Sequence, residues 1–98
     1  MVIAPSGEVD VTTQPLLQAE LKKLQAEKPR KLIVNLAEVP YMDSSGVATL
    51  VQAMQSSRKQ GNALVMCNLQ ERVKNIFHIA KLDSFFTVVV TLEDALAR

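Results

Sequence analysis

Three short apolar runs constrain the fold of this chain more than any other feature. They span residues 32–36 (LIVNL), 63–67 (ALVMC) and 86–90 (FTVVV). Runs of about five residues with little polar interruption are typical of strands whose two faces are both buried, as in a parallel sheet. A shorter stretch at residues 2–4 (VIA) predicts one more strand at the start of the chain.

Helical spacing fills the segments between these runs. The apolar stripes are Leu17, Leu21 and Leu24; Val47, Leu50, Val51 and Met54; and Val73, Ile76, Phe77 and Ala80. Each stripe has the spacing of one face of an amphipathic helix. Thr49 falls opposite the second stripe, so we expect it to face solvent. Strands that alternate with helices predict an α/β fold, with a mostly parallel four-stranded sheet and about four helices.

Capping residues mark several helix ends. Gly61 follows the second stripe, and glycine ends helices readily because it adopts left-handed backbone geometry. Asn68 with Glu71 resembles a capping box before the third helix. Thr91 with Asp94 fits the same pattern before a short last helix.

Length and charge limit the classes of function. A chain of 98 residues is predicted to form one domain, residues 1–98. Its formal net charge of +1 gives no general attraction to nucleic acid or anionic membranes, so we expect neither as a direct partner. No apolar run approaches the roughly 18 residues of a membrane helix, and no signal peptide is evident. The single cysteine, Cys67, suits a reducing compartment, so we expect a cytoplasmic protein.

Two polar loops follow the first two strands, at residues 6–10 (SGEVD) and 43–46 (DSSG). In an open parallel sheet such loops gather at the carboxyl edge, where sites form. Capping of the following helix by Asp and Ser oxygens would explain the second loop. A phosphate on one of its hydroxyls would also be favoured there, by the helix N–H groups and dipole. Spacing alone leaves both interpretations open, and Gly46 would leave room beside the hydroxyl for another protein.

A catalytic serine is a third interpretation, and the sequence disfavours it. Ser44 and Ser45 lack the G-x-S-x-G elbow, and the only imidazole, His78, lies on a helix after the third strand. His78 and Cys67 have no acidic neighbours at metal-ligand spacing, so no metal site is predicted. No glycine-rich phosphate loop is present, so we expect no cofactor and no enzyme activity.

Four sequence segments carry a family resemblance. They are residues 7–10 (GEVD), 31–51 (KLIVNLAEVPYMDSSGVATLV), 59–69 (KQGNALVMCNL) and 72–88 (RVKNIFHIAKLDSFFTV). In this order and spacing they resemble a STAS domain of the bacterial anti-sigma factor antagonist family. The most specific part is the strand that leads through DSSG into a helix. The resemblance implies the STAS-type fold and a regulatory protein that binds other proteins.

The resemblance implies a switch at Ser44. In that family the serine directly after the Asp of the DSSG turn is phosphorylated by the anti-sigma factor, itself a serine kinase. The unphosphorylated antagonist binds the kinase and so frees a sigma factor for transcription. The phosphorylated form dissociates, until a PP2C-type phosphatase resets it. The implied partner-binding residues are Asp10, Asp43, Ser44, Ser45 and Gly46, with Asp10 beside the turn.

One departure from the family concerns the start of the sheet. Family members usually have an additional strand before the one that leads into GEVD, and this sequence starts without it. We therefore expect Val2–Ile3 to form an open sheet edge. Open edges are prone to pair with other strands, so the edge predicts self-association or cover by another chain.

A second function is also implied by resemblance. Small STAS proteins similar to this one are subunits of ABC-type lipid-transport complexes, in which they dock on the ATPase. Those relatives more often carry Thr-Gly in the turn. The Ser44–Ser45 pair therefore favours the phosphorylation switch over the transport subunit.

Overall fold

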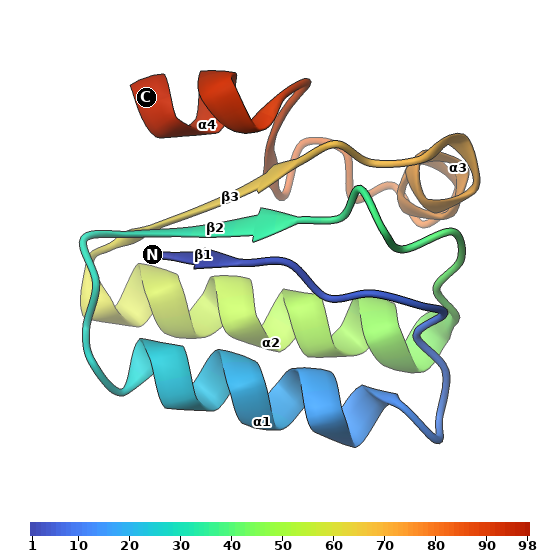
Figure 1. The fold of residues 1–98 in the computed structure, drawn as a ribbon, viewed down its shortest axis with the longest axis horizontal. Coiled ribbons are helices and arrows are strands. Elements are labelled where there is room, and N and C mark those ends of the chain that lie inside the picture. Colours follow the sequence, from blue (N-terminus) through green and yellow to red (C-terminus); the bar gives the residue numbers. More distant parts are fainter.

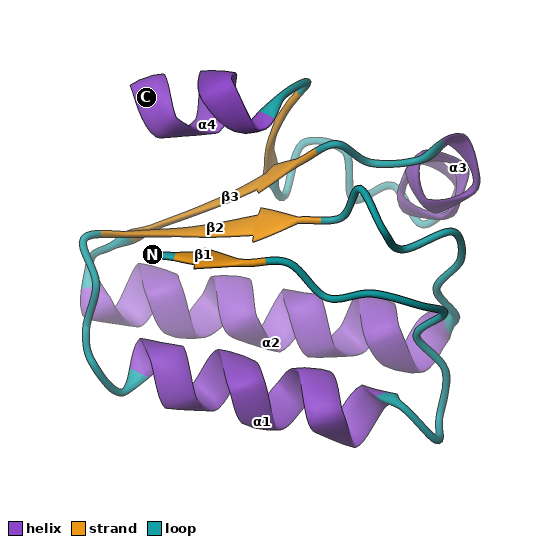
Figure 2. Cartoon of the chain, viewed as in Figure 1, coloured by secondary structure: helices purple, strands orange, loops and turns teal.

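Four parallel strands form one sheet in the computed structural model, which describes residues 1–98. The strands are β1 (Val2–Ile3), β2 (Lys31–Asn35), β3 (Ala63–Cys67) and β4 (Thr87–Val89), in the order β1-β2-β3-β4. The helices are α1 (Gln14–Gln25), α2 (Ser44–Gln60), α3 (Glu71–Ile79) and α4 (Leu92–Ala97). Helices and strands alternate along the chain (Figure 2). The predicted α/β fold is confirmed, and every strand pair is parallel.

The sheet separates two apolar cores. Helices α1 and α2 lie side by side on one face, and α4 covers the other (Figure 1). Leu32 and Val34 of β2 point into the larger core, between the sheet and helices α1 and α2. Ile33, between them, packs with Ala95 of α4 in the smaller core. Successive side chains of a strand point to opposite faces, so β2 and β3 are buried on both sides, as predicted.

The prediction for the last strand was wrong in part. Residues 86–90 were expected to be buried on both faces, but β4 covers only Thr87–Val89. Val88 is 39% exposed and Val90 76% exposed. The reason is that β4 is an edge strand whose outer side has no neighbour. Apolar composition alone does not distinguish an edge strand from a central one.

Thr49 also differs from its prediction. It is 4% exposed instead of facing solvent. The cause is α1, which packs along the side of α2 that carries Thr49. The Thr49 hydroxyl accepts a hydrogen bond from Gln14 Nε2 of α1 (2.8 Å) and donates to Ser45 O (2.9 Å). Thr49, on the side of α2 opposite its apolar stripe, thus links α2 to α1.

Two of the three predicted helix boundaries are confirmed. Gly61 ends α2 in the left-handed conformation (φ 76°). Thr91 and Asp94 form a reciprocal capping box at the start of α4. The predicted box of Asn68 with Glu71 is wrong, because α3 begins at Glu71 itself and has no side-chain cap. Asn68 instead adopts a positive φ of 57° and donates to the side chain of Asn35 (3.1 Å).

Cys67 is expected to react slowly with thiol reagents in the folded protein. It is fully buried in the smaller core, and burial raises the pKa of its thiol, with a further contribution from the charge of Glu93. The thiolate is the reactive form, so a raised pKa and lack of access both slow the reaction. Absorbance on labelling with an aromatic disulfide reagent, with and without denaturant, measures this. Equal rates in both conditions would contradict the burial.

Candidate functional site

Two loops from different parts of the chain meet at the carboxyl edge of the sheet. Val9 N donates to Tyr41 O (3.0 Å), and Asp43 N donates to Val9 O (2.9 Å). Val9 also pairs with Met42 in a parallel bridge, which continues the pairing of β1 with β2 beyond the ends of both strands. The loop of residues 6–10 and the turn of residues 43–46 therefore lie side by side, as the sequence predicted.

Asp43 caps α2 with a single carboxylate oxygen. Asp43 Oδ1 accepts hydrogen bonds from Ser45 N (2.9 Å), Gly46 N (3.4 Å) and Ser45 Oγ (2.6 Å). The first turn of a helix leaves its N–H groups without partners, and Asp43 satisfies two of them. The capping interpretation of the turn is therefore correct. It accounts for Asp43 and Ser45.

Ser44 has no part in this capping network. It is the first residue of α2 and its side chain is exposed, whereas Ser45 is half-buried. None of the hydrogen bonds in the turn uses the Ser44 hydroxyl. Of the two adjacent serines, Ser44 alone presents a free hydroxyl to solvent at the helix start. The capping of α2 therefore does not account for the Ser44 hydroxyl, which is accessible to another molecule.

Gly46 is a packing residue, contrary to the interpretation that it clears space for a partner. It is buried. A Cβ atom at this position would lie 2.5 Å from Met42 Cγ and 2.7 Å from Val9 Cγ1. Those distances are far below van der Waals contact, so only glycine lets the helix approach the two loops this closely. Val9 was not singled out by sequence reasoning, and no local signal connects it with Gly46.

Asp10 holds the neighbouring loop in shape. Its Oδ1 accepts hydrogen bonds from Thr12 Oγ1 (2.6 Å), Thr12 N (2.9 Å) and Thr13 N (3.1 Å), just before α1. These hydrogen bonds lower the pKa of Asp10, and the bond from the Thr12 hydroxyl has the largest effect. The pKa of Asp43 is lowered chiefly by the Ser45 hydroxyl, while the charge of Asp10 opposes this. Two carboxylates thus stay ionised on the two neighbouring loops, close enough for the charge of Asp10 to affect Asp43.

Acid is expected to destabilise the turn through Asp43. Its folded pKa lies below the ordinary value of 3.8, so it stabilises the fold fully above that pH. The contribution declines as the pH falls through the lowered folded pKa, because the unfolded chain then binds more protons. Urea unfolding of wild type and Asp43→Asn at neutral pH and at about pH 3 measures this. The variant should lose less stability between the two conditions than wild type does; an equal loss would contradict the assignment.

An apolar groove runs from the turn toward α3. It has a volume of about 300 Å³ and begins at Ser44. Its apolar lining is Tyr41, Met42, Val47, Ala48, Ile76 and Ala80. The guanidinium of Arg72 lies 4.8 Å from the ring centre of Tyr41, which fixes one wall. Sequence reasoning assigned Val47 and Ile76 to the core and did not find the groove, because it needs the relative placement of α2 and α3.

His78 lies on α3, and its Nδ1 pairs with Asp83 Oδ2 (2.8 Å) at an exposed position rather than approaching either serine. No three side chains among His, Cys, Asp and Glu are grouped closely enough to hold a metal ion. None of the helices combines the length and apolar character that a bilayer crossing requires.

Comparison with known proteins identifies the family of this chain. Residues 1–95 match the STAS domain family. The anti-sigma-B factor antagonist of Bacillus subtilis (strain 168) is 36% identical over 83 residues, which cover 85% of this chain and 75% of that protein. The chain is a STAS-domain protein of the anti-sigma factor antagonist family. This assignment confirms the resemblance carried by the GEVD and DSSG segments.

Solved structures of anti-sigma factor antagonists have the same fold as this chain. An anti-sigma factor antagonist from Mycobacterium paratuberculosis has a TM-score of 0.89 at 27% identity, covering 98% of this chain and 81% of its own. The antagonist SpoIIAA in its unphosphorylated form has a TM-score of 0.82 at 23% identity, covering 99% and 84%. Its phosphorylated form has a TM-score of 0.74 at 22% identity, covering 99% and 87%. This STAS domain thus shares its fold with both forms.

Proposed function

We propose that this STAS-domain protein is a phosphorylation-controlled anti-sigma factor antagonist. When Ser44 is unmodified it binds an anti-sigma factor that is a serine kinase, and a sigma factor is released for transcription. Phosphorylation of Ser44 ends the complex, and a PP2C-type phosphatase restores the binding form. The observation that carries the proposal is the exposed Ser44 hydroxyl, free of hydrogen bonds, beside a Ser45 hydroxyl that donates to Asp43.

The binding surface that we propose surrounds this hydroxyl. Asp10, Asp43 and Ser45 supply its polar part and the backbone at Gly46 its base, all joined through the loop contacts described above. The kinase would bring ATP and the base that accepts the hydroxyl proton, so this chain supplies only the acceptor oxygen. We therefore propose no catalytic activity of its own. Because sigma factors act on RNA polymerase, the cytoplasm is the proposed location.

Phosphate transfer from the cognate kinase tests the proposal. We expect wild type and Ser45→Ala to incorporate phosphate from ATP, and Ser44→Ala to incorporate none. Ser45→Ala is the matched control, since it removes the neighbouring hydroxyl and leaves the acceptor. Mass analysis of the peptide that contains both serines identifies the modified residue. Continued phosphorylation of Ser44→Ala would overturn the assignment of Ser44.

A further inference from the structure

The buried polar residues of this protein all lie in the seam between α1 and α2. They are Gln25, Thr49 and Ser57, with exposures of 6%, 4% and 0%. Gln25 Nε2 donates to Ala53 O (2.8 Å) and to Ser57 Oγ (3.1 Å), and Thr49 is bonded to Gln14 as described above. Burial of polar groups costs free energy that an apolar seam would not cost, so packing alone does not account for these residues.

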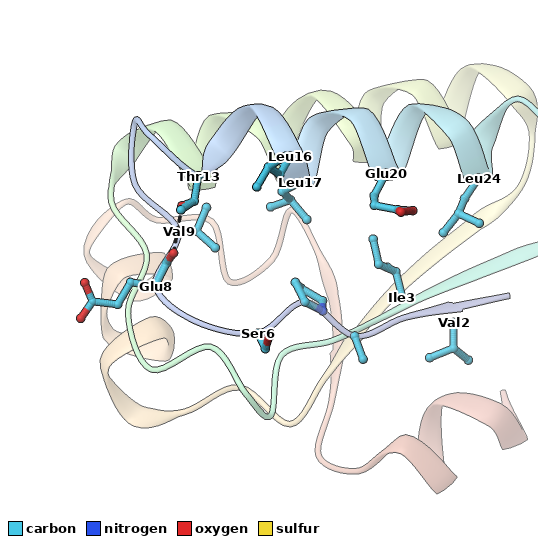
Figure 3. Close-up of a pocket in the computed structure, with 12 residues that line it drawn as sticks. Val2, Ile3, Ser6, Glu8, Val9, Thr13, Leu16, Leu17, Glu20 and Leu24 are labelled. Atoms are coloured by element: carbon cyan, nitrogen blue, oxygen red, sulfur yellow. Dashed lines mark hydrogen bonds between the residues drawn. The ribbon is translucent and has the colours of Figure 1, made fainter.

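A polar groove runs along this seam. Its volume is about 270 Å³. Leu17, Glu20 and Leu24 of α1 point toward β1 (Figure 3), and the groove is lined by a different side of the helix. The polar lining of the groove includes Gln18, Lys22 and Gln25 of α1 and Gln52, Ser56 and Lys59 of α2.

Two lysines give the groove a positive charge. Lys22 and Lys59 come from different helices, and no carboxylate lines the groove with them. Neither takes part in an ion pair, because the only ion pair of the structure joins His78 to Asp83. Two unpaired ammonium groups beside one hollow favour an anion, which they can bind through charge-assisted hydrogen bonds.

Gln25 adds a fixed hydrogen-bond acceptor to these cations. Its two donor bonds to α2 orient the amide, and its Oε1 accepts no hydrogen bond from the chain. The one fully enclosed side-chain oxygen without a partner is Asn62 Oδ1, so Gln25 Oε1 reaches the groove although its residue is only 6% exposed. A bare anion would not satisfy this acceptor, whereas a hydroxyl group of a ligand would.

We propose that this groove binds a small phosphorylated polyol, such as a sugar phosphate. Lys22 and Lys59 hold the phosphate, and Gln25 Oε1 accepts from a hydroxyl group of the polyol. The amide of Gln52 and the hydroxyl of Ser56 also line the groove and bind further hydroxyl groups. An amide and a hydroxyl each both donate and accept, which suits a ligand rich in hydroxyl groups.

The size and lining of the groove exclude larger classes of ligand. Its volume of about 270 Å³ lies below the roughly 300–1,000 Å³ of sites for drug-sized molecules. No aromatic side chain lines it, so it has no surface on which a nucleotide base could stack. Ser44 is not part of the lining, and the site does not rest on the proposed function.

Titration of the isotope-labelled protein with glucose 6-phosphate and with ribose 5-phosphate tests the site. We expect saturable shifts of amide signals centred on residues 18–25 and 49–59. Inorganic phosphate should bind at least about tenfold more weakly, because it lacks the hydroxyl groups that reach Gln25 Oε1, and glucose should not bind. Absence of saturable shifts with both sugar phosphates up to about 10 mM, or shifts centred elsewhere, would overturn the proposal. Equal binding of inorganic phosphate would also overturn it, since the groove would then be an anion site only.

Matched lysine variants distinguish the groove from general attraction of anions. Lys22→Gln and Lys59→Gln should each weaken sugar phosphate binding about tenfold, since each removes one charge-assisted contact. Lys23→Gln is the control, because Lys23 is an exposed neighbour of Lys22 that does not line the groove. It removes the same charge and should change the affinity by less than about twofold. Equal losses for Lys22→Gln and Lys23→Gln would contradict a defined site.

Discussion

Phosphorylation of Ser44 is expected to lower the affinity for the anti-sigma factor kinase by at least about 100-fold. The phosphate adds a charge of about −1.5 to −2 at the surface where we propose that the partner docks. Asp10 and Asp43 are already ionised there, as their lowered pKa values indicate. A complex would have to bury this charge beside two carboxylates. An unpaired charge at an interface costs several kcal/mol, and about 1.4 kcal/mol is tenfold in affinity.

A phosphate on Ser44 would compete with Asp43 for N–H groups at the start of α2. Ser45 N and Gly46 N, which would otherwise bind it, already donate to Asp43 Oδ1. The helix dipole still favours a negative charge at this end, so the folded chain tolerates it. We therefore expect little change in thermal stability on phosphorylation. The expectation that helix N–H groups favour a phosphate here stays a prediction, and Asp43 competes with the phosphate for two of these groups.

Binding measurements on three variants test this prediction. Ser44→Asp should mimic release from the kinase, and Ser44→Ala should bind like wild type, since the small hydroxyl makes no internal bond. Gln55→Asp is the control, because it adds the same charge on an exposed part of α2 away from the turn. Calorimetric titration with the kinase gives the affinities. Full affinity of Ser44→Asp, or equal losses for Ser44→Asp and Gln55→Asp, would contradict the switch.

Gly46→Ala is expected to destabilise the protein by about 1–3 kcal/mol. In an ordinary helix the same change is stabilising, by up to about 1 kcal/mol, so the sign is the informative result. The added methyl would lie 2.5 Å from Met42 Cγ and 2.7 Å from Val9 Cγ1. Both neighbours are buried, with exposures of 0% and 4%, and have little room to move. Relief of the clash would push the residue 6–10 loop away from α2.

Urea unfolding of a double-mutant cycle checks this account. Val9→Ala removes one of the two clashing side chains, so the double variant should lose less stability than the sum of the single changes. Ala48→Val is the matched control, since it adds methyl groups at an exposed position of the same helix. Gly46→Ala should also bind the kinase more weakly, because it displaces Asp10 from the turn. A stabilising effect of Gly46→Ala would show that the close approach is absent.

Local sequence patterns were sufficient for the elements and for the position of the turn. The runs at 32–36 and 63–67 matched strands to within one residue, because continuous apolar character reflects burial on both faces. Gly61 and the Thr91–Asp94 box marked helix ends correctly, since capping involves only a few neighbouring residues. The DSSG turn after a buried strand was likewise visible, and family resemblance rested on it.

Tertiary packing decided which side chains of the turn form hydrogen bonds and which stay exposed to solvent. Spacing and capping patterns alone do not separate Ser44 from Ser45, although the family resemblance points to Ser44. The structure ties Ser45 to Asp43 and leaves Ser44 exposed. Gly46 was expected to leave room for a partner protein. Instead it leaves room for Val9, a residue distant in the chain. The polar groove between α1 and α2 also appears only when the two helices are placed side by side. These features depend on contacts between segments far apart in sequence, and such contacts leave no local periodicity or capping pattern to detect.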